Sequence, residues 1–316
     1  MKIMILGGSG FVGRHLVRRL SRDGHSISVA TRYPNGAKHL GIVPRVSIRH
    51  FDPYDINRLG DELDGHDVLI NLVGILNESG RDGSGFRKAH VELVETAIQA
   101  CAGAGVGRMI QMSALNAGQG ESHYLKTRGQ GEQRVRESDL HWTIFRPSTI
   151  FGPDDSFLNR FAGLLKISPV LPLARPQAMF APVYVGDVVE AFIRALDSRE
   201  SIGEIYELCG AETLTLREIV DWIAHQRGMR RWVIGLPDAL GRLQGRVFDF
   251  VPGKPFSSDN FKSLLLDSVC AEDGFRRLGI QPWGMREKAV EFLGPQGPGR
   301  QVRYQHFRER SGRREG

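Results

Sequence analysis

Short apolar runs alternate with helix-like patterns through the first half of the chain. Six of these runs are bounded by polar residues or glycines and predict strands: 2–6, 26–30, 46–51, 67–73, 108–113 and 142–147. Between them, residues 11–24 and 84–105 carry apolar positions at helical spacing and end in glycines. Strands that alternate with helices predict a parallel sheet with right-handed crossovers. We therefore expect an α/β protein with a Rossmann-like, doubly wound parallel sheet.

The pattern changes after about Gly152. Amphipathic helices are predicted within 155–167, 214–228 and 257–267, and a strand that leads into a helix within 180–196, where Asp187 is placed to cap the helix. We expect these segments to form a smaller C-terminal substrate lobe over the carboxyl ends of the strands, where ligands bind in open α/β sheets. The expected division is a nucleotide-binding sheet domain over 1–151 with later segments returning to it, a lobe mainly over 152–293, and a tail over 294–316.

The net charge of +6 belongs mostly to the end of the chain. From Arg300 onward there are six arginines and two glutamates, a charge of +4, which leaves 6 − 4 = +2 for everything before it. We expect a disordered basic tail with no specific nucleic-acid binding. The hydrophobic share of 41% and the charged share of 25% are typical of a globular protein.

The three cysteines, Cys101, Cys209 and Cys270, lie far apart in the sequence. This spacing predicts a reducing compartment, no disulfide framework and no paired-cysteine metal site, and the histidines also lack ligand-like spacing. No apolar run reaches the length of a membrane span, and a strand that starts at residue 2 leaves no room for a signal peptide. We expect a cytoplasmic protein without a bound metal.

A glycine-rich loop follows the first predicted strand and opens the first helix. Gly7, Gly10 and Gly13 are spaced for a tight turn, for close approach of a pyrophosphate, and for close packing of the helix on the sheet. The helix amino terminus offers unpaired N–H groups and partial positive charge to phosphates. The pattern predicts a dinucleotide site. Its expected contacts within the loop are Gly7, Ser9, Gly10, Phe11, Val12 and Gly13.

The end of the second strand bears on the choice of dinucleotide. An NAD site usually has an acidic residue there, on the ribose hydroxyls, but this chain has Thr31 and Arg32. A guanidinium at this position can hold a 2′-phosphate, so we expect NADP(H) to be preferred, with NAD(H) as the other possibility. Asp52 and Pro53 follow the third strand, where Asp52 can accept from the adenine amino group; its other interpretation is a helix cap.

Several motifs together resemble a known family. The segments GGSGFVGRHL, NLVGIL, MSAL, YLKTRGQGE, RPSTIFGPDDSF and PVYVGDVVEAF have the order and spacing of atypical extended short-chain dehydrogenase/reductases. Within that family the chain looks most like the nucleotide-binding accessory subunit of respiratory complex I and its bacterial relatives, from residue 2 to about 293. The resemblance implies that NAD(P)H lies with its nicotinamide end near Tyr124, Pro147 and Ser148. The other cofactor contacts expected from it are Leu72, Val73, Gly74, Arg128 and Thr149.

The resemblance also implies roles for the helix that carries Tyr124. Active members use a tyrosine that transfers a proton, a lysine four residues later that lowers the tyrosine pKa, and a serine or threonine after the fifth strand. Here Arg128 stands at the lysine position, and Ser113 is the candidate for the third group, with Ala114 as the other register. Arginine keeps the charge but has a wider, planar head, so the cofactor face of the helix is retained and the catalytic geometry is altered.

Three functions remain open from the sequence. The first is a nucleotide-stabilised accessory or assembly factor of a membrane-associated respiratory or quinone-biosynthesis complex, which could place the protein peripherally at the inner face of a bacterial membrane. The second is an active NADP-dependent oxidoreductase or epimerase on a small molecule such as a nucleotide sugar or quinone precursor. The third is an NADPH-reading regulator that uses its basic tail. Arg128 favours the first, and Tyr124 favours the second.

Overall fold

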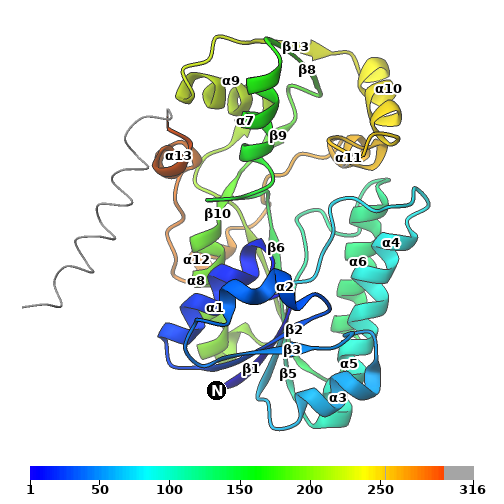
Figure 1. The fold of residues 1–316 in the computed structure, drawn as a ribbon, viewed down its shortest axis with the longest axis vertical. Coiled ribbons are helices and arrows are strands. Elements are labelled where there is room, and N and C mark those ends of the chain that lie inside the picture. Colours follow the sequence, from blue (N-terminus) through cyan, green and yellow to red (C-terminus); the bar gives the residue numbers. More distant parts are fainter. Residues whose placement is uncertain (253, 295–316) are drawn as a thin grey trace, which may run out of the picture.

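The computed structural model describes residues 1–252 and 254–294. A seven-stranded sheet and its covering helices form one part of the molecule, and a smaller lobe stands over one end of that sheet (Figure 1). The expected basic tail lies outside the described residues, apart from Gly294.

The sheet is parallel throughout, with the strand order β11-β6-β5-β4-β1-β2-β3. Its strands are β1 (Lys2–Leu6), β2 (Ser26–Thr31), β3 (Val46–His50), β4 (Val68–Asn71), β5 (Arg108–Met112), β6 (His141–Pro147) and β11 (Glu204–Leu208). The order runs outward in both directions from the neighbours β1 and β4, which makes the crevice beyond their carboxyl ends the expected ligand position. The predicted Rossmann-like, doubly wound sheet is confirmed.

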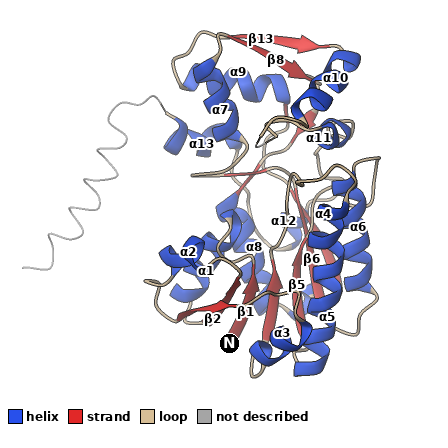
Figure 2. Cartoon of the chain, turned by 45° about the vertical axis from the view of Figure 1, so that its right-hand side comes forward, coloured by secondary structure: helices blue, strands red, loops and turns tan. Residues whose placement is uncertain are grey.

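Helices cover both faces of the sheet (Figure 2). On one face lie α1 (Phe11–Arg22) and α8 (Val185–Asp197), and on the other lie α3 (Ile56–Leu63), α5 (Leu93–Ala104) and α6 (His123–Arg136). Shorter pieces are α2 (Pro34–Ala37), η1 (Lys38–Leu40), α4 (Ser84–Arg87), the π-helical η2 (Lys88–Glu92), η3 (Arg199–Ser201) and α12 (Gly274–Arg277). The inner strands of the sheet are largely buried, which explains why they read as continuous apolar runs, while the edge strands β3 and β11 are more exposed.

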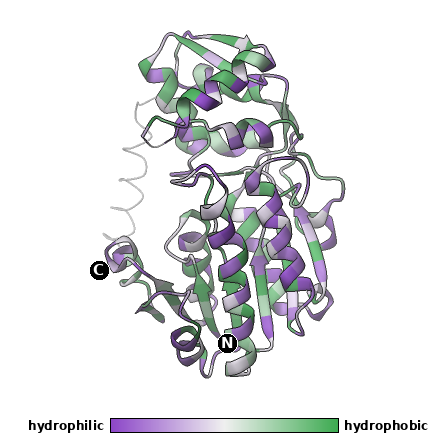
Figure 3. Ribbon diagram, turned by 90° about the vertical axis from the view of Figure 1, so that its right-hand side faces the viewer, coloured by the Kyte–Doolittle hydropathy of each residue, from purple (hydrophilic) through white to green (hydrophobic). Residues whose placement is uncertain are grey.

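The lobe has its own apolar core. It contains the helices α7 (Leu158–Ile167), α9 (Leu216–Gln226), α10 (Asp238–Phe248), α11 (Ser258–Ser263) and α13 (Met285–Leu293). Three two-stranded sheets join them: β7 (Ile150–Phe151) with β10 (Val183–Tyr184), β9 (Met179–Phe180) with β12 (Leu214–Thr215), and β8 (Val170–Ala174) with β13 (Trp232–Leu236). In Figure 3 hydrophobic colours extend to the outer end of this lobe, away from the sheet.

Asp187 does not cap α8 as predicted. The cap position is Tyr184, and no side chain caps that end of the helix. Asp187 lies in the first turn of the helix, where its carboxylate accepts from the Trp283 backbone N–H at 2.8 Å. The segment before α13 therefore engages the carboxylate that the sequence pattern assigned to the helix end.

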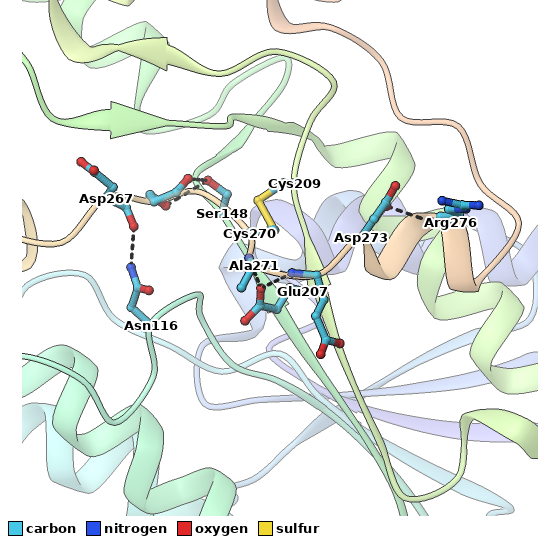
Figure 4. Close-up of a disulfide and its surroundings, with 11 residues drawn as sticks. Asn116, Ser148, Glu207, Cys209, Asp267, Cys270, Ala271, Asp273 and Arg276 are labelled. Atoms are coloured by element: carbon cyan, nitrogen blue, oxygen red, sulfur yellow. Dashed lines mark hydrogen bonds between the residues drawn. A yellow bond between two sulfur atoms is a disulfide. The ribbon is translucent and has the colours of Figure 1, made fainter.

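The expectation of no disulfide is also wrong. Cys209 and Cys270 are bonded to each other, while Cys101 is free and buried (Figure 4). Cys209 directly follows β11, and the stretch after α11 returns past this strand, where the Glu207 carboxylate accepts from the Ala271 N–H at 2.7 Å. The two cysteines are far apart in the sequence, and only the topology of the chain brings them together. The prediction of a reducing compartment, which depended on the absence of a disulfide, loses its basis.

Candidate functional site

The glycine loop has the steric properties of a nucleotide turn. Gly7 has φ +77°, and a Cβ there would lie 3.1 Å from the Leu72 carbonyl carbon. A Cβ on Gly13 would lie 2.4 Å from the Gly7 carbonyl oxygen, so α1 could not pack this closely with any other residue. The two glycines bring the amino terminus of α1 directly over the ends of β1 and β4.

The first turn of α1 presents backbone donors. Gly10 is the N-cap residue, with extended backbone and no side-chain cap, and the first turn carries no acidic residue. The amides of Phe11, Val12 and Gly13 are at helix positions that lack intrahelical partners. Ser9 is half-buried and Gly10 is exposed, which leaves this end of the helix open to an anion.

Cations gather at the end of the loop crevice near β2 and β3. The exposed Arg32 guanidinium lies 5.6 Å from the ring centroid of Tyr33 and 5.9 Å from that of Tyr54. Lys88 Nζ lies 5.0 Å from the same Tyr54 ring. Lys88 belongs to the π-helical η2 and was missed by the sequence analysis, since only the fold brings it beside Arg32.

Asp52 and Pro53 lie beside this group, directly after β3. Asp52 is exposed, and its Oδ1 accepts from the Tyr54 N–H at 3.3 Å. The cap of α3 is Asp55, whose Oδ1 accepts from the N–H groups of Asn57 and Arg58. Asp52 is thus not the helix cap, and its exposed carboxylate stays available for the predicted adenine contact.

Arg128 is built into the ends of two strands. Its side chain is buried, and Nη1 donates to the carbonyl oxygens of Val73 at 3.3 Å and Met112 at 3.0 Å. A Cβ on Gly74 would lie 1.8 Å from Nη2, so Gly74 provides the space that the guanidinium fills. The guanidinium thereby connects the loop after β4 with the end of β5. Leu72, the residue before Val73, is buried beneath the glycine loop.

Two buried polar atoms at this place have no partner within the described residues. They are Nε of Arg128 and the Oγ of Ser113, which follows Met112. A buried donor or hydroxyl without a partner costs free energy, so such atoms call for a partner such as water, an ion or a bound ligand. Together with the glycine loop, they fit a dinucleotide whose nicotinamide end lies over β4 and β5. Ala114 is also buried, so burial does not decide whether Ser113 or Ala114 occupies the third catalytic position.

Tyr124 is half-buried in the first turn of α6. Its ring makes edge contacts with Phe86 and His90, and the Arg128 guanidinium carbon lies 5.5 Å from the ring centroid. The Asp259 carboxylate, from the lobe helix α11, accepts from the backbone N–H groups of His123 and Tyr124 at 2.6 and 3.1 Å. This contact fixes the start of α6 against the lobe, with the Arg128 cation facing the tyrosine ring.

His90 joins three parts of the site and was not found from the sequence. Its Nε2 accepts from the Ile75 N–H at 3.3 Å, and its Nδ1 lies 2.9 Å from the Thr127 hydroxyl, which in turn donates to the His123 carbonyl at 2.8 Å. Burial, with the charge of Arg128 adding to it, lowers the pKa of His90 to about 2. The ring is therefore neutral, with the proton on Nδ1.

Two glycines of the RGQGE motif explain how α6 approaches its neighbours. A Cβ on Gly129 would lie 2.3 Å from the Gly118 Cα, and one on Gly131 would lie 2.1 Å from the His90 carbonyl oxygen. These glycines let α6 press on the loop after β5 and on η2, which positions Tyr124 and Arg128.

The residues after β6 are engaged with the lobe. Pro147 and Ser148 are buried, and Thr149 is half-buried. The Ser148 hydroxyl donates to the Ser268 carbonyl at 2.8 Å and lies 2.9 Å from the Ser268 hydroxyl, close to the disulfide (Figure 4). Both the hydroxyl and the N–H of Ser148 are thus engaged within the protein, the N–H with the Leu208 carbonyl at 2.9 Å, and its cofactor contact stays a prediction.

Two hollows flank α6. A narrow pocket of about 40 Å³ lies between the lobe and the sheet domain, and residues from both parts line it, including Glu78, Phe86, His123 and Lys254. A wider hollow of about 370 Å³ lies on the other side of the helix, with the exposed Lys126 and the ion-paired Glu132 and Arg146 in its lining. Lys126 thus faces away from Tyr124 and cannot replace the missing lysine.

The fold and this crevice define a nicotinamide-dinucleotide protein. A family model described as NAD(P)H-binding matches residues 7–156. The chain is 30% identical over 241 residues to ceramide reductase of Caulobacter vibrioides, covering 75% of this chain and 74% of the relative. It belongs to the atypical extended short-chain dehydrogenase/reductases and is an NAD(P)H-binding member of them.

Other similarities place it within that family. The chain is 29% identical over 310 residues to NADH dehydrogenase (ubiquinone) 1 alpha subcomplex subunit 9, mitochondrial, of Arabidopsis thaliana, covering 92% of this chain and 76% of that protein. An NADPH-dependent quinone oxidoreductase from Escherichia coli, solved with NADPH, has a TM-score of 0.72 at 20% identity over 92% of this chain and 99% of that one. The latter similarity shows the shared fold. Within the described residues, no helix is long and apolar enough to cross a bilayer.

Proposed function

We propose that this chain holds NADP(H) as a stabilising ligand and serves as an accessory or assembly factor of a quinone-linked respiratory membrane complex, with slow or absent turnover. The observation that carries the proposal is the position of Arg128. Its guanidinium is committed to the carbonyl oxygens of Val73 and Met112 and faces the ring of Tyr124. A cation held in this way stabilises the strand ends on which the nucleotide would lie. It is poorly placed to activate the hydroxyl of Tyr124.

Relatives support the accessory role. The mitochondrial proteins of Arabidopsis thaliana and Mus musculus that the chain resembles over 92% of its length carry the name of a subunit of NADH dehydrogenase. The clustering of Arg32 and Lys88 around Tyr54 supports the 2′-phosphate form of the dinucleotide.

The first experiment measures stabilisation and turnover together. NADPH at a hundredfold excess over its dissociation constant should stabilise the fold by about 2.7 kcal/mol. NADPH oxidation by short-chain quinones should stay at background in the wild type. The control is Gly10→Asp, because aspartate is a good N-cap residue but would repel the phosphates. That variant should fold and lose the stabilisation by NADPH.

A second candidate function is an NADPH-dependent reductase. It is favoured by the half-buried Tyr124 at the start of α6 and by the similarity to ceramide reductase. In that case Tyr124 would donate the proton, Ser113 would hold the substrate carbonyl, and bound NADPH would supply a hydride. Rapid NADPH oxidation that disappears in Tyr124→Phe would overturn the accessory proposal. Arg128→Lys should raise any latent rate, and an unchanged rate would show that α6 is not an altered active-site helix.

A further inference from the structure

The lobe exposes apolar side chains on β13, on α10 and at Phe250, which follows α10. We call the α10 surface the set of Trp232, Ile234, Leu240, Leu243, Val247 and Phe250. Their exposed fractions run from 50% for Leu240 to 76% for Trp232. Figures 1 and 2 both place β8, β13 and α10 at the end of the molecule farthest from the N-terminus.

The rotation of α10 is fixed by its inner face. A Cβ on Gly241 would lie 2.8 Å from the Phe261 ring, and one on Gly245 would lie 3.1 Å from the Ser257 carbonyl oxygen. The glycine face must therefore stay against the lobe. Leu243 and Val247, four residues apart, point outward as a consequence. The small residues of α10 therefore face the lobe and its large apolar residues face water. An exposed apolar surface of this kind is typical of an interaction site.

The charges around the α10 surface are positive. Arg242 and Arg246 are exposed on the same helix, and the Arg81 guanidinium lies 4.1 Å from the ring centroid of Phe250. None of these three arginines is in an ion pair within the described residues. Of the acids at the two ends of the helix, Asp238 is ion-paired with Arg175, and Asp249 accepts from the Ser258 N–H and keeps its negative charge.

We propose that the α10 surface docks on an anionic lipid bilayer. An amphipathic helix that lies in the bilayer interface combines an outward apolar face with flanking arginines, and tryptophan suits the headgroup boundary. A second copy of the chain is a poorer occupant, because a symmetric contact would bring two copies of this arginine-bearing surface together. The inference goes beyond the proposed function, since it holds whether or not Tyr124 supports turnover.

The test uses the full-length chain with vesicles of phosphatidylcholine mixed with phosphatidylglycerol, and with phosphatidylcholine alone. Because the basic tail could also bind anionic vesicles, insertion is followed by Trp232 fluorescence, with Trp232→Phe as the reference. A blue shift with the anionic vesicles only is expected. Leu243→Ser/Val247→Ser and Arg242→Gln/Arg246→Gln should each weaken partitioning on the order of tenfold.

Matched controls lie on the sheet domain: Ile42→Ser, whose side chain is 88% exposed, and the exposed Arg22→Gln. Neither control variant should change the partitioning of the protein onto vesicles. Every variant should still be stabilised by NADPH, which shows that the variant is folded. Equal binding by the double variants and the wild type would overturn the proposal. The proposal would also be overturned if the chain self-associated without lipid and Leu243→Ser/Val247→Ser abolished that association. A lack of vesicle binding, together with stable attachment to a partner protein through this surface, would overturn it as well.

Discussion

Arg32 is the side chain whose loss should separate the binding of NADPH from that of NADH. It is exposed at the end of β2 and has no ion-pair partner within the described residues, so its charge is available to a phosphate. Arg32→Ala should weaken NADPH binding by about tenfold to a hundredfold, the loss of one charge-assisted hydrogen-bonded contact, and leave NADH nearly unchanged. Calorimetric titration with both dinucleotides measures the difference.

Arg22→Ala is the matched control, because this exposed arginine lies at the far end of α1 from the glycine loop. It should affect neither dinucleotide. Equal losses of NADPH and NADH in Arg32→Ala would refute the 2′-phosphate clamp.

Residue positions within one helix could be predicted, but contacts between elements could not. The spacing of Tyr124 and Arg128 on a helix implied that they are neighbours, and the guanidinium does lie over the ring. The carbonyl partners of Arg128 come from other segments, and His90 reaches the site only because η2 packs against α6. No local pattern marks such residues, since their role depends on which strands become adjacent.

At the scale of elements, Gly131 sets the distance between α6 and η2. Gly131→Ala would gain about 1 kcal/mol of helix propensity but would force a methyl against the His90 carbonyl oxygen, a contact of 2.1 Å. We expect a net destabilisation of about 1–3 kcal/mol, as for other overpacked sites, and a loss of NADPH affinity as α6 shifts. Denaturant unfolding and nucleotide titration measure the two effects.

Gly163→Ala in α7 provides the comparison, because a Cβ there would meet nothing within 4 Å. That change should be neutral or stabilise the fold by up to about 1 kcal/mol. If both alanine variants behaved alike, the close approach of α6 would not need a glycine.

The prediction of elements succeeded for strands that are buried on both faces, because such strands have continuous apolar runs. The inner strands of the parallel sheet are covered on both faces, and the apolar runs of the six predicted strands gave bounds within one or two residues, as for β1 and β6. The seventh strand, β11, was not predicted. The lobe ribbon of β8 and β13 was not anticipated. β8 contains Pro172, and β13 alternates exposed Trp232 and Ile234 with buried Val233, so neither has the apolar run of a core strand.

At the scale of the whole molecule, Asp187 couples the sheet domain to the segment before α13. Burial raises the pKa of Asp187 to about 6, against the opposing effects of the Trp283 N–H and Lys288. Because the folded state then binds its proton more tightly than the unfolded state, ionisation destabilises the fold as pH rises from about 4 to 6. The cost is at most about 3 kcal/mol and is constant at higher pH.

Asp187→Asn retains an oxygen acceptor for the Trp283 N–H and removes the titration. Its unfolding free energy relative to wild type should therefore rise between pH 4 and pH 6 and then level off, as measured by chemical denaturation. Asp197→Asn, exposed at the end of the same helix, should show no such rise. A flat difference for Asp187→Asn would mean that this carboxylate is better solvated than its burial implies.

The Cys209–Cys270 bond has a consequence for the integrity of the chain. The two cysteines are 61 positions apart, and the segment between them contains β12, α9, β13, α10 and α11, and with them the whole α10 surface. These elements therefore form a covalent ring that starts and finishes at the edge of the main sheet. A single backbone cleavage anywhere in that ring would leave one molecule, and only a reductant would release the severed halves from each other.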